Sequence, residues 1–196
     1  LGVWLSMGTL RVIGGTARGI RLKPVPGDTT RPITDIVKEA LFNILGDEVV
    51  DARVLDLFAG TGAVAIEALS RGAESAFLLD KSAQAVRVIH ENLAAARLSE
   101  RAHVRRGDAF AYLATAPERT YDLVYVAPPQ YKEMWQKAMD LLDQQPARLS
   151  DAGQVIVQIN PLEWVDRNYA NLVEFDRRKY GDTLLIFFEK RQREND

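Results

Sequence analysis

Residues 54–68 read VLDLFAGTGAVAIEA, two apolar segments joined by a glycine turn. The aliphatic composition before the turn predicts a buried strand over 52–58, and the sequence after it favours a helix over 63–72. Gly60 and Gly62 permit a tight turn and the close approach of a ligand to bare backbone. Because open α/β sheets bind ligands beyond the carboxyl ends of their strands, we predict a ligand site at this turn.

The alternation of strand and helix continues along the chain. We predict strands over 75–80, 102–108, 121–127 and 153–160, helices over 82–98 and 132–145, and two closing strands over 171–180 and 182–191. Such alternation is typical of a mostly parallel, doubly wound α/β sheet, and an antiparallel pair at the end is compatible with it.

The region before the first strand has a different pattern. Residues 9–23, TLRVIGGTARGIRLK, predict two short strands around a Gly14–Gly15 turn, which together make a β-hairpin. Thr34 then precedes DIVKEALFNIL, whose apolar residues have helical spacing. We therefore expect a helix that is N-capped by Thr34.

Composition argues against several kinds of site. The chain has no cysteine and only two histidines, so we expect no disulfide and no metal centre. No apolar run approaches the roughly 20 residues that span a bilayer. The opening LGVWLS has neither the basic region nor the cleavage site of a signal peptide. We expect a soluble, cytoplasmic protein, and the sequence leaves its oligomeric state open.

The net charge of −2 conceals two basic ends. Residues 8–38 carry six basic side chains against two acidic ones, and residues 177–193 carry the same numbers. If the two ends meet in space, they could form a phosphate-binding face. On charge alone, two ordinary solvated edges are the simpler interpretation.

Three aspartates stand at or near the ends of three successive predicted strands. Asp56, just before the glycine turn, would repel a pyrophosphate but suits the cationic amino-acid end of S-adenosylmethionine. Asp80 could accept hydrogen bonds from ribose hydroxyls, and Asp108 could accept one from an adenine amino group. A single such aspartate is commonly a turn or cap residue. Three of them beside a glycine turn favour a shared nucleoside-binding crevice.

Six segments appear in order between about Leu10 and Lys190: RVIGGTARGIRL, TRPITDIVKEALFNIL, VLDLFAGTGAVAIEALSRGA, the strand ending in Asp80, RGDA and RKYGDT. Together they resemble the bacterial family of small-subunit (16S) ribosomal RNA guanine-N2 methyltransferases. The glycine turn alone is typical of methyltransferases in general, whereas the N-terminal segments are specific to this family. The resemblance implies a Rossmann-like, S-adenosylmethionine-dependent methyltransferase fold with an N-terminal β-hairpin. It also implies methylation of a guanine exocyclic amine, with ribosomal RNA or the assembling small subunit as the partner.

The resemblance implies roles for individual residues. The glycine turn would hold the methionine part of S-adenosylmethionine, Asp80 the ribose and Asp108 the adenine. The implied cofactor-binding residues are Asp56, Phe58, Gly60, Thr61, Gly62, Asp80, Lys81, Asp108 and Ala109. The basic residues implied to contact RNA phosphates are Arg11, Arg18, Arg21, Lys23, Arg31 and Lys38. The chain would then divide into an N-terminal arm with an RNA-binding hairpin, residues 1–33, and a methyltransferase domain, residues 34–196.

The fourth predicted strand ends at a rigid elbow. The elbow reads Ala127, Pro128, Pro129, Gln130 and Tyr131. The family has Asp or Asn here, then Pro-Pro, then Tyr or Phe. In that motif a side-chain oxygen and a backbone carbonyl would accept both N–H bonds of the guanine amine, and the ring would stack on the flipped base. The resemblance thus places the catalytic residues at 127–131, with alanine where the acceptor side chain would stand.

Other residues could compensate for the altered motif. Gln130 or Asn43 could supply an acceptor oxygen, although a core or capping role is the simpler interpretation of Asn43. Tyr131 or Trp135 could supply the stacking ring, or both could pack beneath the following helix.

Three functions remain open. The first is an active ribosomal RNA guanine-N2 methyltransferase with a rearranged acceptor. The second is a catalytically weak or inert homologue that binds S-adenosylmethionine and RNA as a ribosome assembly factor. The third is a methyltransferase with a changed, non-RNA target. The aspartates favour cofactor binding and the hairpin favours RNA, so we favour the first.

Overall fold

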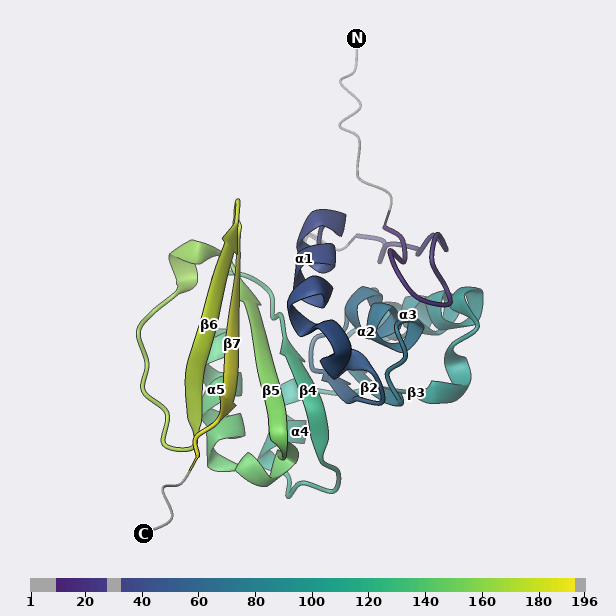
Figure 1. Ribbon diagram of the computed structural model, residues 1–196. Coiled ribbons are helices and arrows are strands. Elements are labelled where there is room, and N and C mark those ends of the chain that lie inside the picture. The colour runs from purple at the N-terminus through teal and green to yellow at the C-terminus, as the bar shows by residue number, and fades with distance from the viewer. Residues whose placement is uncertain (1–9, 28–32, 193–196) are drawn as a thin grey trace.

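The computed structural model describes residues 10–27 and 33–192. Its centre is a seven-stranded sheet in the order β3-β2-β1-β4-β5-β7-β6 (Figure 1). The strands are β1 (Arg53–Asp56), β2 (Ser75–Asp80), β3 (Ala102–Arg106), β4 (Tyr121–Val126), β5 (Leu149–Ile159), β6 (Leu172–Tyr180) and β7 (Thr183–Lys190). Strands β1 to β5 are parallel, and β7 pairs antiparallel with β5 and β6. The predicted sheet with an antiparallel end is confirmed.

Helices cover both faces of this sheet (Figure 1). One face packs against α1 (Asp35–Leu45), α2 (Ala63–Ser70) and α3 (Ala83–Ala96), and the other against α4 (Ala109–Ala114) and α5 (Met134–Gln144). Helix α4 has no counterpart in the sequence prediction, because so short a helix shows too little periodicity. Among the described residues, no helix is long and apolar enough to cross a membrane.

Side chains along the strands alternate between these two helical layers. In β1, Val54 faces the layer of α1 to α3, and Leu55 faces α4 and α5. In β4, Val124 faces α4 and α5, and Tyr125 faces the other layer. Because both faces of the sheet are buried at its centre, the central strands β1, β2 and β4 read as apolar runs, which makes them recognisable in the sequence.

Two helices begin at the residues predicted to cap them. The side chain of Thr34 accepts a hydrogen bond of 3.3 Å from the Val37 N–H, and that of Ser82 accepts one of 3.2 Å from the Ala85 N–H. Helix α5 begins only at Met134, later than predicted. The backbone before it takes positive φ angles, 60° at Tyr131 and 52° at Glu133, which helical backbone does not adopt.

The N-terminal hairpin, residues 10–23, forms without its two predicted strands. A single antiparallel bridge joins Arg11 and Arg21. The N–H groups of Ile13 and Gly14 donate to the carboxylate of Glu67 on α2, at 2.9 and 2.8 Å. The pairing of the two predicted strands is confirmed only around this bridge, where the Val12 and Leu22 N–H groups donate across the hairpin. Beyond it the prediction is wrong, because a helix side chain takes hydrogen bonds that a strand ladder would use.

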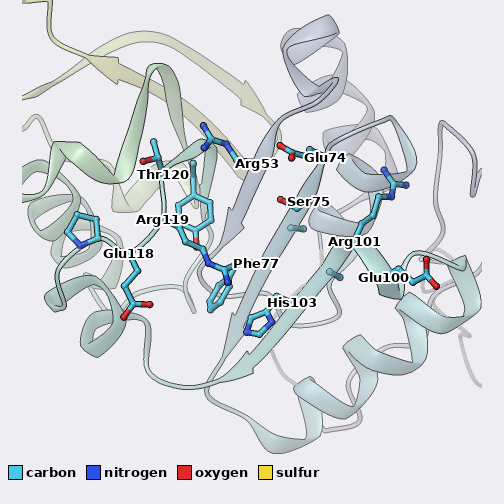
Figure 2. A pocket seen from close by; sticks show the side chains of 14 residues that line it. Arg53, Glu74, Ser75, Phe77, Glu100, Arg101, His103, Glu118, Arg119 and Thr120 are labelled. Atoms are coloured by element: carbon cyan, nitrogen blue, oxygen red, sulfur yellow. The ribbon is translucent and has the colours of Figure 1, made fainter.

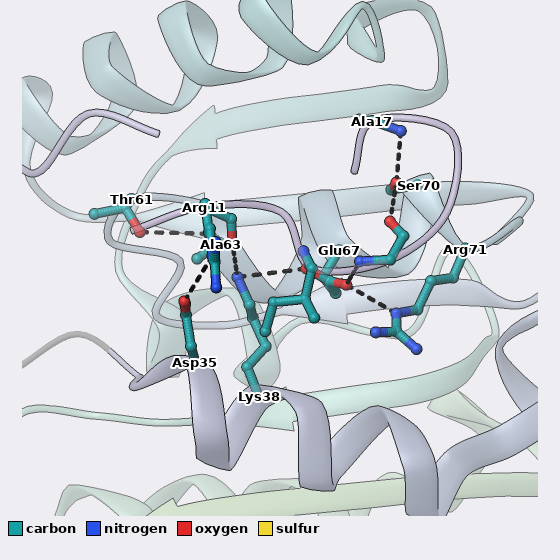
Figure 3. Close-up of polar contacts among 11 residues, drawn as sticks. Arg11, Ala17, Asp35, Lys38, Thr61, Ala63, Glu67, Ser70 and Arg71 are labelled. Carbon is teal, nitrogen blue, oxygen red and sulfur yellow. Dashed lines mark hydrogen bonds and ion pairs between the residues drawn. The ribbon is translucent and has the colours of Figure 1, made fainter. Parts of the chain in front are cut away.

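The N-terminal hairpin packs closely on the carboxyl end of α2 (Figure 3). Gly15, with φ of 75°, lies so near Ser70 that a Cβ atom would stand 1.8 Å from the Ser70 carbonyl oxygen. That carbonyl accepts a hydrogen bond of 2.8 Å from the Thr16 N–H, and the Ser70 hydroxyl accepts one of 2.9 Å from the Ala17 N–H. Only glycine fits at position 15, so the basic hairpin is fixed to the helix that follows the glycine turn. The division of the chain at residue 33 stays a prediction.

Candidate functional site

A cavity of about 910 Å³ lies at the carboxyl ends of β1, β2 and β4. Its wall combines the glycine turn, the ends of three strands and the elbow after β4. The predicted site residues that line it are Asp56, Phe58, Gly60, Thr61, Asp80, Lys81, Asp108, Ala109, Ala127, Pro128, Pro129, Gln130 and Tyr131. One cavity thus contains the residues that the sequence assigns to cofactor binding and those that it assigns to catalysis.

The two glycines of the turn have different surroundings. Gly60 has a φ of 55°, and open space lies where a Cβ would project, so its backbone is accessible from the cavity. Gly62, with a φ of 78°, is the N-cap of α2, and a Cβ there would approach Ile66 and Leu78 at 3.3 Å. Gly62 is not part of the cavity wall, so it shapes the turn and packs against the core.

Asp56 is the most buried of the three predicted ligand carboxylates, with 1% of its surface exposed. Burial raises its pKa to about 7; the charge of Asp80 adds to the rise, and a hydrogen bond from the Phe58 backbone opposes it. Within the described residues, its Oδ1 atom has no hydrogen-bond partner. A buried carboxylate with an unpaired oxygen at a cavity wall fits a cationic or hydrogen-bond-donating ligand group.

Asp80 and Asp108 make local backbone contacts at the cavity. Asp80 accepts hydrogen bonds of 2.8 Å from the Gly60 N–H through Oδ2 and from the Ser82 N–H through Oδ1. Asp108 is the N-cap of α4, and its Oδ1 accepts from the N–H groups of Phe110 and Ala111. Both side chains therefore stabilise a turn or a helix N-terminus, which is a common role for aspartate. Each also lines the cavity.

The elbow places one aromatic ring at the cavity and buries another. Tyr131 is 64% exposed and lines the cavity, and its N–H donates to Glu163 at 2.7 Å. Trp135 is only 1% exposed, inside the core beneath α5. Of the two predicted stacking rings, Tyr131 is therefore available and Trp135 is a packing residue. Asn43 lies exposed on α1 and outside the cavity wall, whereas Gln130 is part of it.

The predicted RNA-binding arginines of the N-terminal hairpin are exposed. Within the described residues, the Arg18 and Arg21 side chains form no ion pair or hydrogen bond. Arg11 pairs with Asp35 at 3.0 Å, and Lys23 pairs with Glu91 at 2.8 Å. Exposed pairs of this kind are weak and can exchange for a phosphate.

Lys38 is not available to RNA, which corrects the prediction. Its side chain is fully buried, and its ammonium group lies 3.4 Å from the carboxylate of Glu67 and donates to the Arg11 carbonyl. Burial lowers the pKa of Lys38, and the charge of Glu67 opposes that shift. Lys38 thus fixes the N-terminal hairpin from within. Arg31, the remaining predicted RNA contact, lies outside the described residues.

The cavity wall also contains residues that the sequence analysis does not assign to the site. Tyr125, Gln158 and Thr183 line it from β4, β5 and β7, and the segment 25–27 closes it from the N-terminal side. Gln158 stands near the carboxyl end of a parallel strand, so the rule that identifies Asp56 could also have found it. Thr183 and segment 25–27 come from the two basic ends of the chain, although none of the described basic residues of those ends lines the cavity.

A second hollow, of about 680 Å³, lies at the amino ends of β1 to β4 (Figure 2). None of the predicted site residues that the structure describes lines it. Two of its arginines already have partners: Arg53 pairs with Asp122 at 3.0 Å, and Arg101 donates to the carbonyls of Ala73 and Leu69. These contacts favour a structural role for this edge of the sheet.

The sheet order, the helices on both faces and the glycine turn after β1 define a Rossmann-like fold of the S-adenosylmethionine-dependent methyltransferase type. The chain belongs to the family described as Conserved hypothetical protein 95, whose model matches residues 10–189. The resemblance found in the sequence is confirmed at the level of this family.

Named relatives agree with this membership. The chain is 36% identical to a putative rRNA methyltransferase, YlbH, of Bacillus subtilis, over 93% of this chain and 100% of the relative. It is 39% identical to ribosomal RNA small subunit methyltransferase D of Escherichia coli, over 69% of this chain and 68% of that protein. Among solved structures, a putative methyltransferase, yhhF, of Escherichia coli superposes with a TM-score of 0.82 at 32% identity, covering 93% of this chain and 98% of the other.

Proposed function

We propose that this protein transfers a methyl group from S-adenosylmethionine to the exocyclic N2 of a guanine in small-subunit ribosomal RNA. The observation that carries the proposal is the shared cavity, in which the glycine turn and its carboxylates face the Pro-Pro elbow. A methyl donor held by the first group would lie beside a base held by the second. The names of the relatives supply the class of RNA.

The proposed cofactor fits the residues of the wall. Asp56 offers to a cationic amino group a buried oxygen that has no hydrogen-bond partner in the described part of the chain, and Gly60 leaves its backbone open to a close approach. Asp80 and Asp108 lie beside them, where carboxylates can accept hydrogen bonds from a ribose and an adenine. When bound there, S-adenosylmethionine would supply a methyl group on a positively charged sulfur.

The elbow would hold the acceptor base. Pro128 is buried and Pro129 is half-buried, so the segment offers rigid backbone with no N–H groups to compete for the base. A carbonyl of this segment can accept one N–H bond of the guanine amine. Tyr131, exposed at the cavity, can stack on a base flipped out of its helix.

The basic residues of the N-terminal hairpin would bind the RNA backbone. Among the residues that the structure describes, Arg18 and Arg21 have guanidinium groups without a partner, whereas the exposed cationic groups of Arg11 and Lys23 each form a surface ion pair. Phosphate contacts of this kind position a nucleic acid without reading its sequence. We infer that the N-terminal hairpin orients the RNA while the elbow selects the base.

Ala127 favours a second candidate function. Since the family motif has an acidic or amide side chain at this position, a chain with alanine could bind S-adenosylmethionine and RNA without transferring a methyl group. It would then act as an assembly factor for the small subunit.

A methyl-transfer assay separates the two candidates. The protein is incubated with labelled S-adenosylmethionine and with small ribosomal subunits that lack this modification, and the labelled nucleotide is mapped. We expect the label on N2 of a guanine. Cofactor binding measured by calorimetry, without any transfer, would instead establish the second candidate, and transfer to another atom would contradict the guanine specificity.

A further inference from the structure

Gln158 and Ala127 are neighbours on adjacent parallel strands. The last registered pair between β4 and β5 is Val126 with Val157. The next residues are Ala127, which directly follows β4, and Gln158 in β5. Tyr125 and Ala127 pack with the layer of α1 to α3, as does Ile156, which stands two residues before Gln158. Side chains two apart on a strand share a face, so Gln158 and Ala127 project on the same side.

The Gln158 side chain is held at the cavity and only half-buried. Its Oε1 atom accepts a hydrogen bond from the hydroxyl of Tyr125, which is 5% exposed. Tyr125 is itself paired in register with Asp56 on β1. The amide is therefore oriented by a buried partner, and its carbonyl oxygen keeps a second lone pair.

The other polar side chains are less suited to replace an acceptor at position 127. Asn43 does not line the cavity, and Gln130 is exposed on the loop beyond the two prolines. Asp56 stands on the far side of Tyr125 from Gln158 in the strand order, at the glycine turn. Gln158 alone among these combines a place in the cavity wall, a fixed orientation and a strand position next to Ala127.

We propose that Gln158 supplies the acceptor oxygen that alanine removes from the elbow, and is thus a catalytic residue of this protein. The inference rests on the proposed function. The Gln158 Oε1 atom would accept one N–H bond of the guanine amine, while a carbonyl of the Pro-Pro segment accepts the other. With both N–H bonds held, the nitrogen lone pair points out of the base plane and toward the methyl group.

The transfer step balances without a protein base. The amine nitrogen forms a bond to the methyl carbon, and the electrons of the carbon–sulfur bond return to sulfur, which becomes neutral. The nitrogen, now positively charged, loses its extra proton to water. The Gln158 amide takes no proton, since it acts only through a hydrogen bond that strengthens as charge develops on the nitrogen.

Four proteins test this proposal: the wild type, Gln158→Leu, Gln154→Leu and the double variant Gln158→Leu/Ala127→Asp. Gln154 is a matched control, because it lies on the same strand and face but contacts Glu48, away from the cavity. Methyl transfer is measured with saturating S-adenosylmethionine and small subunits, and cofactor affinity by calorimetry.

We expect Gln158→Leu to lower kcat by about 10- to 100-fold, the effect of one hydrogen bond, with cofactor affinity unchanged. Gln154→Leu should keep the wild-type rate, and the added carboxylate of the double variant should restore much of the activity. If the wild type is active and Gln158→Leu is equally active, the role of Gln158 is overturned and the proposed function is not. A wild type that binds the cofactor and transfers no methyl group overturns the proposed function and this inference with it.

Discussion

Lys38 and Glu67 form an ion pair, 3.4 Å between Nζ and Oε2, in which neither side chain has any exposed surface (Figure 3). Glu67 also accepts hydrogen bonds from Arg71 at 2.8 Å and from two backbone N–H groups of the N-terminal hairpin. One carboxylate therefore joins α1, α2 and the hairpin. Removing a single partner of a buried pair is costly, because it leaves an uncompensated buried charge.

We predict that Glu67→Ala lowers the free energy of unfolding by roughly 3–5 kcal/mol. The loss follows from the unpaired Lys38 ammonium and from the hairpin N–H groups that lose their acceptor. Urea denaturation measures it, and Glu91→Ala is the matched control, because Glu91 pairs with Lys23 at the surface. A small change in both variants would contradict the central role of Glu67.

Lys38 also shows which part of the site the sequence could have predicted and which part it could not. Lysine is almost always exposed, so a lysine in a basic region is naturally interpreted as a phosphate contact. Yet Lys38 stands three, four and seven residues before Leu41, Phe42 and Leu45, which places it on the buried face of α1. That spacing was a usable signal. Its partner Glu67 lies far along the chain on another helix, and only the tertiary structure identifies it.

The cavity was predictable because it follows from topology. Asp56 and Asp80 end β1 and β2, and Asp108 follows β3 by two residues. The carboxyl ends of such parallel strands lie along one edge of the sheet. The absence of regular strands in the N-terminal hairpin was not predictable, since the sequence pattern is typical of strands but the Ile13 and Gly14 N–H groups donate to Glu67. Helix side chains that replace a strand partner leave no periodic signal in the sequence.

Asn92 connects the N-terminal hairpin to the glycine turn. Its side chain, 1% exposed, accepts from the Lys23 N–H at 2.7 Å and donates to the carbonyls of Lys23 and Thr61 at 3.0 and 2.9 Å. We predict that Asn92→Leu, of similar size, lowers the free energy of unfolding by roughly 2–4 kcal/mol, since three backbone groups lose their partner. Hydrogen exchange should also quicken at the Lys23 amide.

The control for Asn92 is the same substitution at an exposed asparagine. Asn43→Leu, on the surface of α1, should change neither the urea midpoint nor the exchange rate at Lys23. If the Lys23 amide exchanges no faster in the Asn92→Leu variant than in the Asn43→Leu variant, the connection between hairpin and turn does not depend on the Asn92 side chain.

The raised pKa of Asp56 predicts pH-dependent cofactor binding. With a pKa of about 7, Asp56 is largely protonated below that pH, whereas a cationic amino group prefers the carboxylate. Affinity for S-adenosylmethionine should therefore rise with pH, by up to about tenfold per unit below pH 7, and level off above it. Calorimetry from pH 6 to 8 measures this, and Asp56→Asn should bind weakly with a flat profile in that range.

The raised pKa of Asp56 should also make the stability of the unliganded protein depend on pH. The folded state holds the Asp56 proton more tightly than the unfolded chain does, so the free energy of unfolding should fall as pH rises from about 4 to about 7. Asp56→Asn removes this contribution, and its stability should decline less over the same window in urea denaturation. Identical slopes in the two proteins would mean that Asp56 ionises normally.

Arg18 and Arg21 should carry much of the salt dependence of RNA binding. Because both are exposed and unpaired within the described residues, each can neutralise a phosphate and release a counterion. Reversing both charges with Arg18→Glu/Arg21→Glu should weaken binding and reduce the slope of log K against log salt by about 1 to 2. Arg119→Glu, at the opposite edge of the sheet, is the control and should leave the slope unchanged. The cofactor affinity of the double variant, measured in parallel, should match that of the wild type. If the double variant binds RNA as the wild type does, the N-terminal hairpin is not part of the RNA interface.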